Sequence, residues 1–405
     1  AGEQLVIIAQ GRSEATNENV PLSAPIVELL EVLDLTATSA SGTKASEAVT
    51  VQHPLQPFDP GYFDPARADL RSADRLALDA ATALLAEPVQ ARRRYALEPL
   101  PEPDLTRGVS LGEMIGFFGR PAGTLLKIRT GISPTENPTI SDTIPIEPGA
   151  LEKWQIGNRV LHRLREGLDP EAVLKAEWLR GEVPPFALGQ NLISDVLTQA
   201  RGSVRQLPAE LPTPVLHDLS LSVEVPAHGL VPLSGRVTTH ARELVQVEYS
   251  SAHARHRLSV WLRLLALAAS EDGHWRARLI GRGRTVLYEA PPQAVASALL
   301  GRYLQLYALG LSRPLPALPR LCFAWAQYRV SRRDPEDRRV SRDRFDQCWN
   351  YDSDDATRAF FAYPDLLELP ASEVAVPGAE PSERTLVGAL ASSIWGPVMS
   401  AEVPS

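Results

Sequence analysis

Cysteine and lysine are scarce in this sequence of 405 residues. Its two cysteines, Cys322 and Cys348, cannot form a disulfide framework, and they lack the CxxC spacing of zinc and iron–sulfur sites. Of the 41 basic residues only four are lysines, and none follows Lys175, so the C-terminal half cannot supply a catalytic lysine. We therefore expect a protein of the reducing cytoplasm without a cysteine-based metal site.

Motifs for nucleotide binding and membrane insertion are also missing. A phosphate-binding loop ends in Gly-Lys-Ser/Thr, whereas Gly42-Thr43-Lys44 lacks the spacing and the stretch from Gly281 to Arg284 lacks the lysine. The longest apolar run, near Val260 to Ala269, is shorter than the ~20 residues that cross a bilayer. We expect a soluble protein with no cofactor and no membrane contact. The opening AGEQLVIIAQ is typical of a domain interior and predicts a piece of a longer polypeptide.

Charge is unevenly distributed along the chain. The net charge is −8, yet residues 252–344 hold 17 Arg against 7 Asp or Glu, a net of +10 that leaves −18 for the remainder. A basic segment on an acidic protein indicates a face able to meet phosphate. The alternative is a set of solvated helix faces. A hydrophobic share of 44% and a length of about 150 residues per domain favour two or three globular domains.

The first hundred residues predict a sheet-domain remnant followed by a linker. The apolar run from Leu5 to Ala9 is typical of a buried strand, and residues 21–35 have a helical stripe with Pro25 in the first turn. Residues 36–50 look like a loop. Four prolines make residues 51–65 an extended strap with three aromatic side chains. A helix ending before Pro88 and a proline-rich linker should follow.

The remaining chain predicts a compact α/β domain from Thr106 onwards. Ser110 and Glu113 have the spacing of a capping box, so a helix should begin at Ser110. Apolar periodicity then predicts helices, strands, a helix, strands and a long helix. The expected elements are helices over 151–164, 172–179 and 188–196, strands from Leu216, a helix over 258–268, a hairpin over 274–292 and a helix over 294–311.

Residues 229–251 predict an active-site hairpin that has lost its chemistry. Apolar positions form two strands, and the polar residues 238–242 suggest the turn between them. A two-metal nuclease would place one acid at the end of the first strand and an acid-x-Lys triplet at the end of the second. Here the corresponding residues are Thr238 and Glu248-Tyr249-Ser250. One carboxylate cannot hold a metal pair, so we expect no catalytic residue and no metal. The alternative is an active Mg²⁺ nuclease that uses Glu248 with Glu224 or Glu243.

A row of arginines is the candidate DNA-binding feature. Arg276, Arg278, Arg282 and Arg284 recur along the second hairpin and could grip phosphates, while Trp275 and Tyr288 could stack on bases. The alternatives are an edge strand protected by charge, or a region that binds only partner subunits. Histidines and aspartates give weak metal signals, which are better explained as strand-end residues and helix caps. They are His240, His253, His256, Asp352, Asp354 and Asp355.

Four segments resemble the RecC family, the gamma subunit of exodeoxyribonuclease V. The most specific is the strap HPLQPFDPGYFDP. The others are VSLGEMIGFFGRPAGTLLKIRTGI, RGEVPPFALGQ and AQGRSEATNENVPLSAPIVELLEVL. The likeness covers nearly the whole chain.

The resemblance implies three parts. Residues 1–50 would end a helicase-like domain without ATPase chemistry, residues 51–105 would form the strap, helix and linker, and residues 106–405 would have a PD-(D/E)xK nuclease fold with a dead site. It further implies a non-catalytic subunit that scaffolds RecB-like and RecD-like partners in a heterotrimer for double-strand-break repair by homologous recombination. Such a subunit helps to split duplex DNA, guides the single strands and supports the response to Chi. Most residues that contact Chi would lie outside this chain.

Overall fold

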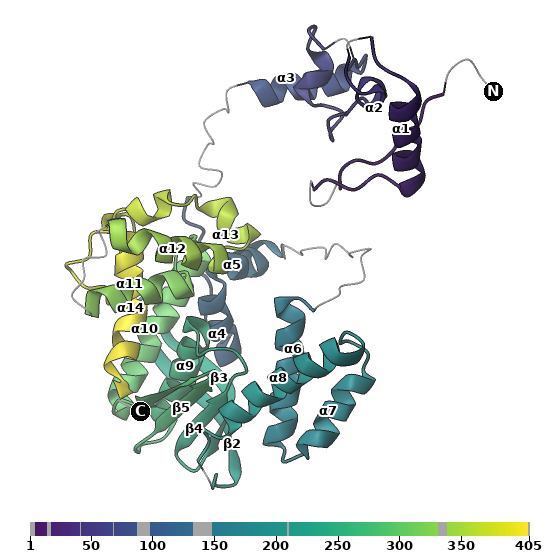
Figure 1. Cartoon of the computed structure of the whole chain (residues 1–405). Coiled ribbons are helices and arrows are strands. Elements are labelled where there is room, and N and C mark those ends of the chain that lie inside the picture. Colours follow the sequence, from purple (N-terminus) through teal and green to yellow (C-terminus); the bar gives the residue numbers. More distant parts are fainter. Residues whose placement is uncertain are drawn as a thin grey trace. The chain divides into compact units, whose positions relative to one another are not determined.

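The chain divides into two compact units. The computed structural model describes residues 5–13, 18–40, 42–67, 69–86, 98–132, 148–208, 210–330 and 338–403, with the backbone alone for 338–342. The units are Ala1–Arg92 and Arg93–Ser405 (Figure 1). This division is based on contacts within the structure and does not test the three parts implied by the resemblance. The limits 1–50, 51–105 and 106–405 for those parts stay a prediction.

The first unit consists of short helices. α1 (Ala24–Thr36) begins with Pro25 in its first turn, as predicted, because that position needs no N–H donor. α3 (Arg75–Leu85) confirms a second predicted helix, and the Asp74 carboxylate caps it by accepting hydrogen bonds from two backbone N–H groups. α2 (Ala45–Val49) and the 3-10 helix η1 (Pro60–Phe63) complete the unit, and η1 interrupts the strap that was expected to be extended throughout.

Two further predictions for this unit are wrong. Leu5 to Ala9 is not a buried strand, since it has no regular structure and Ile8 is 94% exposed. An apolar run becomes a strand only where neighbours accept and donate its backbone hydrogen bonds, and the described part of this unit has no strand to do so. Residues 36–50 are not all loop, because the Asp34 carboxylate holds the start of α2 through the N–H and hydroxyl of Ser46, each at 2.8 Å.

The second unit is built on a mixed sheet of seven strands. The path of paired strands is β1-β3-β4-β5-β6-β7, and β2 pairs with the other edge of β3. β4 and β5 are parallel and are joined through α9 (Ala254–Ser270), whereas β2–β3 and β5–β6 are antiparallel hairpins. This arrangement confirms the α/β class. The strands are β1 (Val109–Ser110), β2 (Pro214–Val225), β3 (Gly229–His240), β4 (Glu243–Val247), β5 (Arg276–Gly281), β6 (Arg284–Glu289) and β7 (Glu402–Val403).

The predicted hairpin over residues 229–251 is wrong in its partner and its turn. β3 pairs along its whole length with β2, and it meets β4 only at His240↔Glu243. Residues 238–240 belong to β3, and the turn is Ala241-Arg242, with Ala241 at φ 52°. The alternation of buried Val237 and buried Thr239 continues the strand. Threonine is polar but β-branched, so its polarity was a misleading turn signal.

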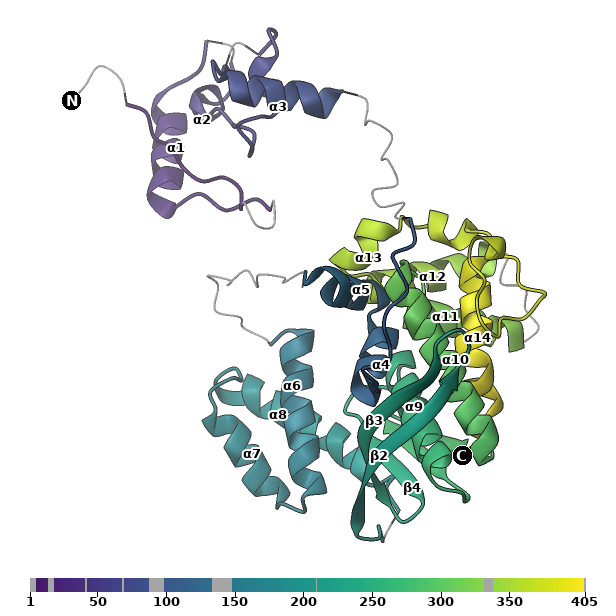
Figure 2. The ribbon, with the colours of Figure 1, turned by 180° about the vertical axis from the view of Figure 1, so that it is seen from behind.

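Helices cover both faces of the sheet (Figures 1 and 2). On one face, α4, α9, α10, α11 and α14 enclose the main hydrophobic core around Trp261, Tyr303 and Trp395. On the other face, α6 (Ala150–Arg165), α7 (Pro170–Leu179) and α8 (Phe186–Val204) pack on Val247 of β4 and Ile280 of β5. The remaining elements are α4 (Leu111–Gly119), α5 (Pro121–Thr130), α10 (Gln293–Ser312), α11 (Pro319–Val330), α12 (Arg338–Asp352), α13 (Asp355–Phe360), η2 (Asp365–Glu368), η3 (Ala371–Glu373) and α14 (Leu386–Ser400).

Several predicted elements of this unit are confirmed. The capping box is present, since Glu113 N–H donates to Ser110 Oγ at 3.1 Å and Ser110 N–H donates to Glu113 Oε2 at 2.9 Å. The helices α6 to α10 and the β5–β6 hairpin lie where the periodicity placed them. Gly283, at φ 71°, serves the hairpin turn.

The longest apolar helix is a core helix. Among the described residues only α10 is long and apolar enough to cross a membrane by length and composition. More than half of its most apolar stretch is buried, and it packs against α9 and β2. The sequence analysis considered the apolar run near Val260 to Ala269, which lies on α9, and did not consider α10. The apolar composition of α10 is therefore explained by its burial in the layer of helices that covers the sheet.

Candidate nucleic-acid interface

The residues predicted to occupy degenerate nuclease positions do not converge on one point. Thr238 is exposed on β3 opposite Leu216, two residues before the pair that joins β3 to β4. Glu248 follows the far end of β4, where its N–H donates to the carbonyl of Ile280 at 2.8 Å. The Glu248 carboxylate accepts a hydrogen bond from Gln246 Nε2 at 2.7 Å. In the described parts of the chain, no group of three or more His, Cys, Asp or Glu could hold a metal ion.

The two acids considered as partners for Glu248 lie elsewhere. Glu224 is exposed near the β2–β3 turn, opposite Leu230. Glu243 begins β4, while Glu248 follows its end, and the Glu243 carboxylate accepts a hydrogen bond from Arg278 Nε at 2.8 Å. The five residue steps from Glu243 to Glu248 span about 16 Å in an extended strand. An active nuclease centred on Glu248 is therefore unsupported.

The predicted row of arginines separates into paired and unpaired members. Arg276 pairs with Glu289 at 3.0 Å, Arg278 with Glu243 at 2.8 Å and Arg284 with Glu402 at 3.3 Å. The guanidinium of Arg282, in the β5–β6 turn, has no hydrogen bond or ion pair with any described residue. The other three arginines form ion pairs within the folded protein, and their DNA-binding role stays a prediction.

The predicted stacking role of Trp275 is wrong. Its side chain is 1% exposed, and its indole N–H donates to the carbonyl of Glu271 at 3.1 Å. Tyr288, the second proposed stacking residue, is 0% exposed. Side chains alternate along β5, so Arg276 and the partly buried Arg278 point to one face while Trp275, Ala277 and Leu279 point into the core on the other. Neither ring can reach a base.

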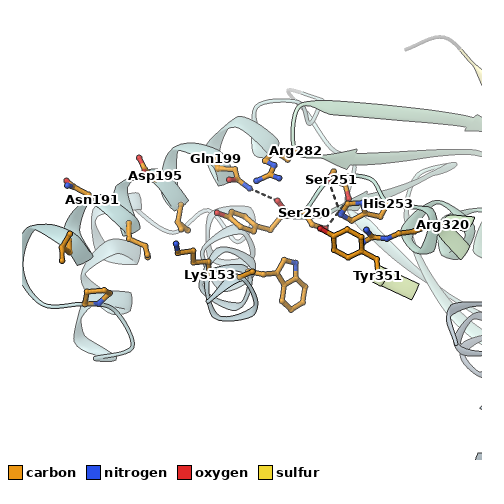
Figure 3. Close-up of a pocket in the computed structure, with 17 residues that line it drawn as sticks. Lys153, Asn191, Asp195, Gln199, Ser250, Ser251, His253, Arg282, Arg320 and Tyr351 are labelled. Atoms are coloured by element: carbon orange, nitrogen blue, oxygen red, sulfur yellow. Dashed lines mark hydrogen bonds between the residues drawn. The ribbon is translucent and has the colours of Figure 1, made fainter. Parts of the chain in front are cut away.

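A pocket of about 740 Å³ lies at the carboxyl ends of the parallel strands β4 and β5. Open α/β sheets commonly bind ligands at this edge. Helices α6 and α8 line one side, and Arg320 of α11 and Tyr351 of α12 line the other (Figure 3). The lining residues are Ala150, Lys153, Trp154, Pro184, Leu188, Asn191, Leu192, Asp195, Val196, Gln199, Tyr249, Ser250, Ser251, His253, Arg282, Arg320 and Tyr351.

Backbone contacts hold the floor of this pocket. Arg282 N–H donates to the carbonyl of Ser250 at 3.0 Å, which ties the β5–β6 turn to the segment after β4. Gly281 permits this approach, since a Cβ there would lie 2.4 Å from the backbone nitrogen of Ala252. On the helical side, Gln199 Nε2 donates to the carbonyl of Tyr249 at 3.0 Å. These contacts connect the segment after β4 to the β5–β6 turn and to α8.

The pocket is basic and partly aromatic. Lys153, Arg282 and Arg320 line it against a single described acid, Asp195. Figure 3 shows Asn191 and Asp195 at one end of the pocket and Arg320 beside the ring of Tyr351 at the other. The guanidinium carbon of Arg320 lies 4.3 Å from the centre of that ring. Trp154 and Tyr351 are 37% and 70% exposed, so both rings present surface to a ligand.

His253 is held neutral in this setting. Burial is the main cause that lowers the pKa of His253 to about 4, and the guanidinium groups of Arg320 and Arg282 add to it. The His253 ring also lies 3.3 Å from Ser251 Oγ through Nε2. A pKa lowered partly by neighbouring cations indicates a positive potential at the pocket wall, which would favour a bound anion.

A buried carboxylate supports the Arg320 side of the pocket. Asp352 Oδ2 accepts a hydrogen bond from the backbone N–H of Arg320 at 2.6 Å, and Oδ1 lies 3.8 Å from the guanidinium groups of both Arg255 and Arg320. The Asp352 side chain is fully buried. Asp354 caps α13 through Thr357 N–H, as the predicted capping role requires. His240 Nδ1 lies 2.7 Å from the carbonyl oxygen of Pro212.

Sequence reasoning found Arg282 but missed most of this pocket. Lys153, Trp154, Arg320 and Tyr351 lie on three helices far apart in the chain, so no local spacing links them. The available signal was the short polar stretch 250–253 between a strand and a helix. Such a junction marks the carboxyl edge of a parallel strand, where a ligand site is expected.

Comparison with known proteins shows the family of this chain. The family model described as RecC C-terminal domain matches residues 106–330. The RecBCD enzyme subunit RecC of Mycobacterium tuberculosis is 32% identical over 99% of this chain, and that of Mycolicibacterium smegmatis is 32% identical over all of it. The RecC subunit of Escherichia coli is 26% identical over 80% of this chain. The chain belongs to the RecC family.

Two limits apply to these likenesses. The chain spans 37% of the length of the mycobacterial relatives and 29% of the Escherichia coli relative. A solved structure titled "Crystal structure of SSO0001" aligns with 53% of this chain and 92% of its own, at 15% identity and a TM-score of 0.17. That score is too low to inform the fold.

Proposed function

We propose that this chain is a DNA-handling part of a RecC-type subunit in a RecBCD-like helicase–nuclease, and that it neither cuts DNA nor hydrolyses ATP. The observation that carries the proposal is the relationship to RecC subunits over 99% of the chain. In this role the chain contacts double- and single-stranded DNA and helps to split the duplex and guide its strands. It serves double-strand-break repair by homologous recombination.

The non-catalytic assignment rests on the residues at the former metal positions. Thr238 and Ser250 are neutral, and Glu248 already accepts a hydrogen bond from Gln246. Mg²⁺ in a nuclease needs several carboxylate oxygens at one point. We infer that residues 106–405 have a PD-(D/E)xK nuclease-like fold with a dead site. The mixed sheet with its parallel β4-α9-β5 unit is compatible with that origin.

Partner subunits and location follow from the same relationship. The proposal includes a heterotrimer with RecB-like and RecD-like subunits, an end of a helicase-like domain in residues 1–50, and support of the Chi response in the full subunit. Residues that contact Chi would lie outside this chain. Free Cys322, whose burial raises its thiol pKa, suits the reducing cytoplasm.

Incubation of the purified chain with linear DNA and Mg²⁺ or Mn²⁺ tests the non-catalytic assignment. We expect both single- and double-stranded DNA to remain intact, because no described carboxylate cluster could bind the metal. A Glu248→Ala variant serves as the control for contaminating nucleases. Cleavage by the wild-type chain that Glu248→Ala abolishes would establish the rival, a Mg²⁺ nuclease.

A further inference from the structure

We propose that the pocket at the ends of β4 and β5 binds a single-stranded nucleic acid, with Arg282 and Arg320 on its phosphates and Tyr351 stacked on a base. The inference rests on the proposed DNA-handling function and assigns it a site. The pocket combines the two features that sequence-tolerant strand binding requires, a cationic track and exposed aromatic faces.

Charge defines the phosphate end of the site. Arg282 has no pairing carboxylate among the described residues, so its charge is available to a ligand. Arg320 is 3.8 Å from buried Asp352, a contact that orients its guanidinium while its other face lies over Tyr351. Lys153 of α6 lines the opposite wall. Among the described lining residues, Arg282 and Arg320 face one acid, Asp195, and this balance favours a phosphate.

Shape favours one strand over a duplex. The pocket is recessed between α6 and α8 on one side and α11 and α12 on the other, and its volume of about 740 Å³ is that of a small-molecule site. A paired duplex hides the faces of its bases, whereas a single strand exposes them for stacking on an aromatic ring. The 70% exposed ring of Tyr351 offers such a face. Trp154 offers a second ring across the pocket.

The adjoining surface extends the same chemistry. A neighbouring cavity of about 470 Å³ shares His253, Arg320 and Tyr351 with the pocket and adds Asp343, Arg344 and Gln347 of α12. A strand that leaves the pocket past Tyr351 therefore meets another arginine and an amide beside one acid. An acidic peptide would meet the same cations, but it would make no use of the aromatic faces.

Binding of a fluorescent single-stranded DNA of about a dozen nucleotides to the full chain, followed by anisotropy across a salt series, tests the proposal. We expect Arg282→Gln to weaken binding about fivefold to tenfold and to lower the slope of log affinity against log salt by about 0.7, the value for one phosphate contact. Tyr351→Ala should weaken binding about fivefold or more through lost stacking, whereas Tyr351→Phe, which keeps the ring, should bind like wild type.

The matched control is Arg236→Gln on β3, which removes an arginine that is 74% exposed and paired with Asp218 outside the pocket. It should leave affinity unchanged. Equal affinity of Arg282→Gln, Tyr351→Ala and wild type would overturn the site while leaving DNA handling intact. Displacement of the strand by polyglutamate as readily as by unlabelled DNA would assign the pocket to an acidic peptide and overturn the proposal. Failure of the wild-type chain to bind the strand would also overturn it, while the metal-dependent cleavage assay judges the proposed function separately.

Discussion

At the residue scale, His253 connects the stability of the protein to the charge of the pocket. It stands at the N-cap position of α9, without a side-chain hydrogen bond to the helix, and lines the pocket beside Ser251. Burial, then the charges of Arg320, His256 and Arg282, disfavour its protonation. The ring therefore stays neutral at neutral pH. Protonation would add a positive charge to a pocket already lined by Lys153, Arg282 and Arg320.

We expect acid to destabilise the protein through His253. Its pKa is about 4 in the folded protein and about 6.5 when unfolded, so between these values the unfolded chain binds a proton that the folded chain excludes. The free energy of unfolding should fall as pH drops from about 6.5 to about 4. The ring is only half-buried, so solvent screening reduces the loss to about 1–2 kcal/mol.

Urea unfolding of wild type and His253→Gln at pH 7 and pH 5 measures this loss. Wild type should lose more stability between the two values than His253→Gln, which carries no titrating ring. An equal loss in both proteins would show that His253 is not the responsible group. The same residue reports on the pocket, since a phosphate bound nearby should raise the His253 pKa in an NMR titration.

At the element scale, α9, α11 and α12 meet around Asp352. The carboxylate receives the Arg320 N–H at the start of α11 and lies near the guanidinium of Arg255 on α9. Removal of one member of a buried charge cluster leaves the others without compensation. We therefore expect Asp352 to hold the Arg320 and Tyr351 side of the pocket in place.

Replacement of Asp352 by alanine should lower the free energy of unfolding by about 3 kcal/mol, because it leaves the Arg320 N–H without its acceptor and the guanidinium groups of Arg255 and Arg320 without their nearby counter-charge. Urea unfolding at pH 7 measures the change. Asp355→Ala, which removes an exposed acid from the first turn of α13, is the control and should cost under about 1 kcal/mol. A loss below 1 kcal/mol for Asp352→Ala would show that the cluster contributes little.

The elements that sequence could predict are those fixed by local chemistry. The Ser110 and Glu113 capping box, Pro25 at a helix start and Gly283 in a two-residue turn each depend on neighbours within a few residues. Thr238 was misassigned to a turn because its place in a strand is decided by the twelve residue pairs between β3 and the preceding strand β2. Trp275 was misplaced because alternation alone does not say which face of β5 is covered.

The candidate site was harder to predict for the same reason. Its cations and rings come from α6, the β5–β6 turn, α11 and α12, which only the tertiary fold brings together. Of the predicted DNA-binding residues, Arg282 lies in the pocket, and Arg276, Arg278 and Arg284 pair with acids outside its lining. The local sequence pattern predicted a basic hairpin, but it could not show which of its arginines pair with carboxylates in the folded protein.

At the scale of the whole molecule, the chain belongs to a family whose relatives are RecBCD enzyme subunits, and it spans 37% of the length of the mycobacterial ones. The mixed sheet places a basic, aromatic pocket at the strand ends, and the described residues offer no metal cluster there. The family relationship and the basic pocket support the proposed DNA-handling role.

The most direct measurement uses a complete RecC-type subunit that contains this chain, assembled with RecB-like and RecD-like subunits on a forked duplex with a photoreactive single strand. The account predicts ATP-dependent unwinding, crosslinks from the single strand to residues 93–405, and strand cleavage that Glu248→Ala leaves unchanged. Unwinding without any crosslink to these residues, or cleavage that Glu248→Ala abolishes, would contradict it.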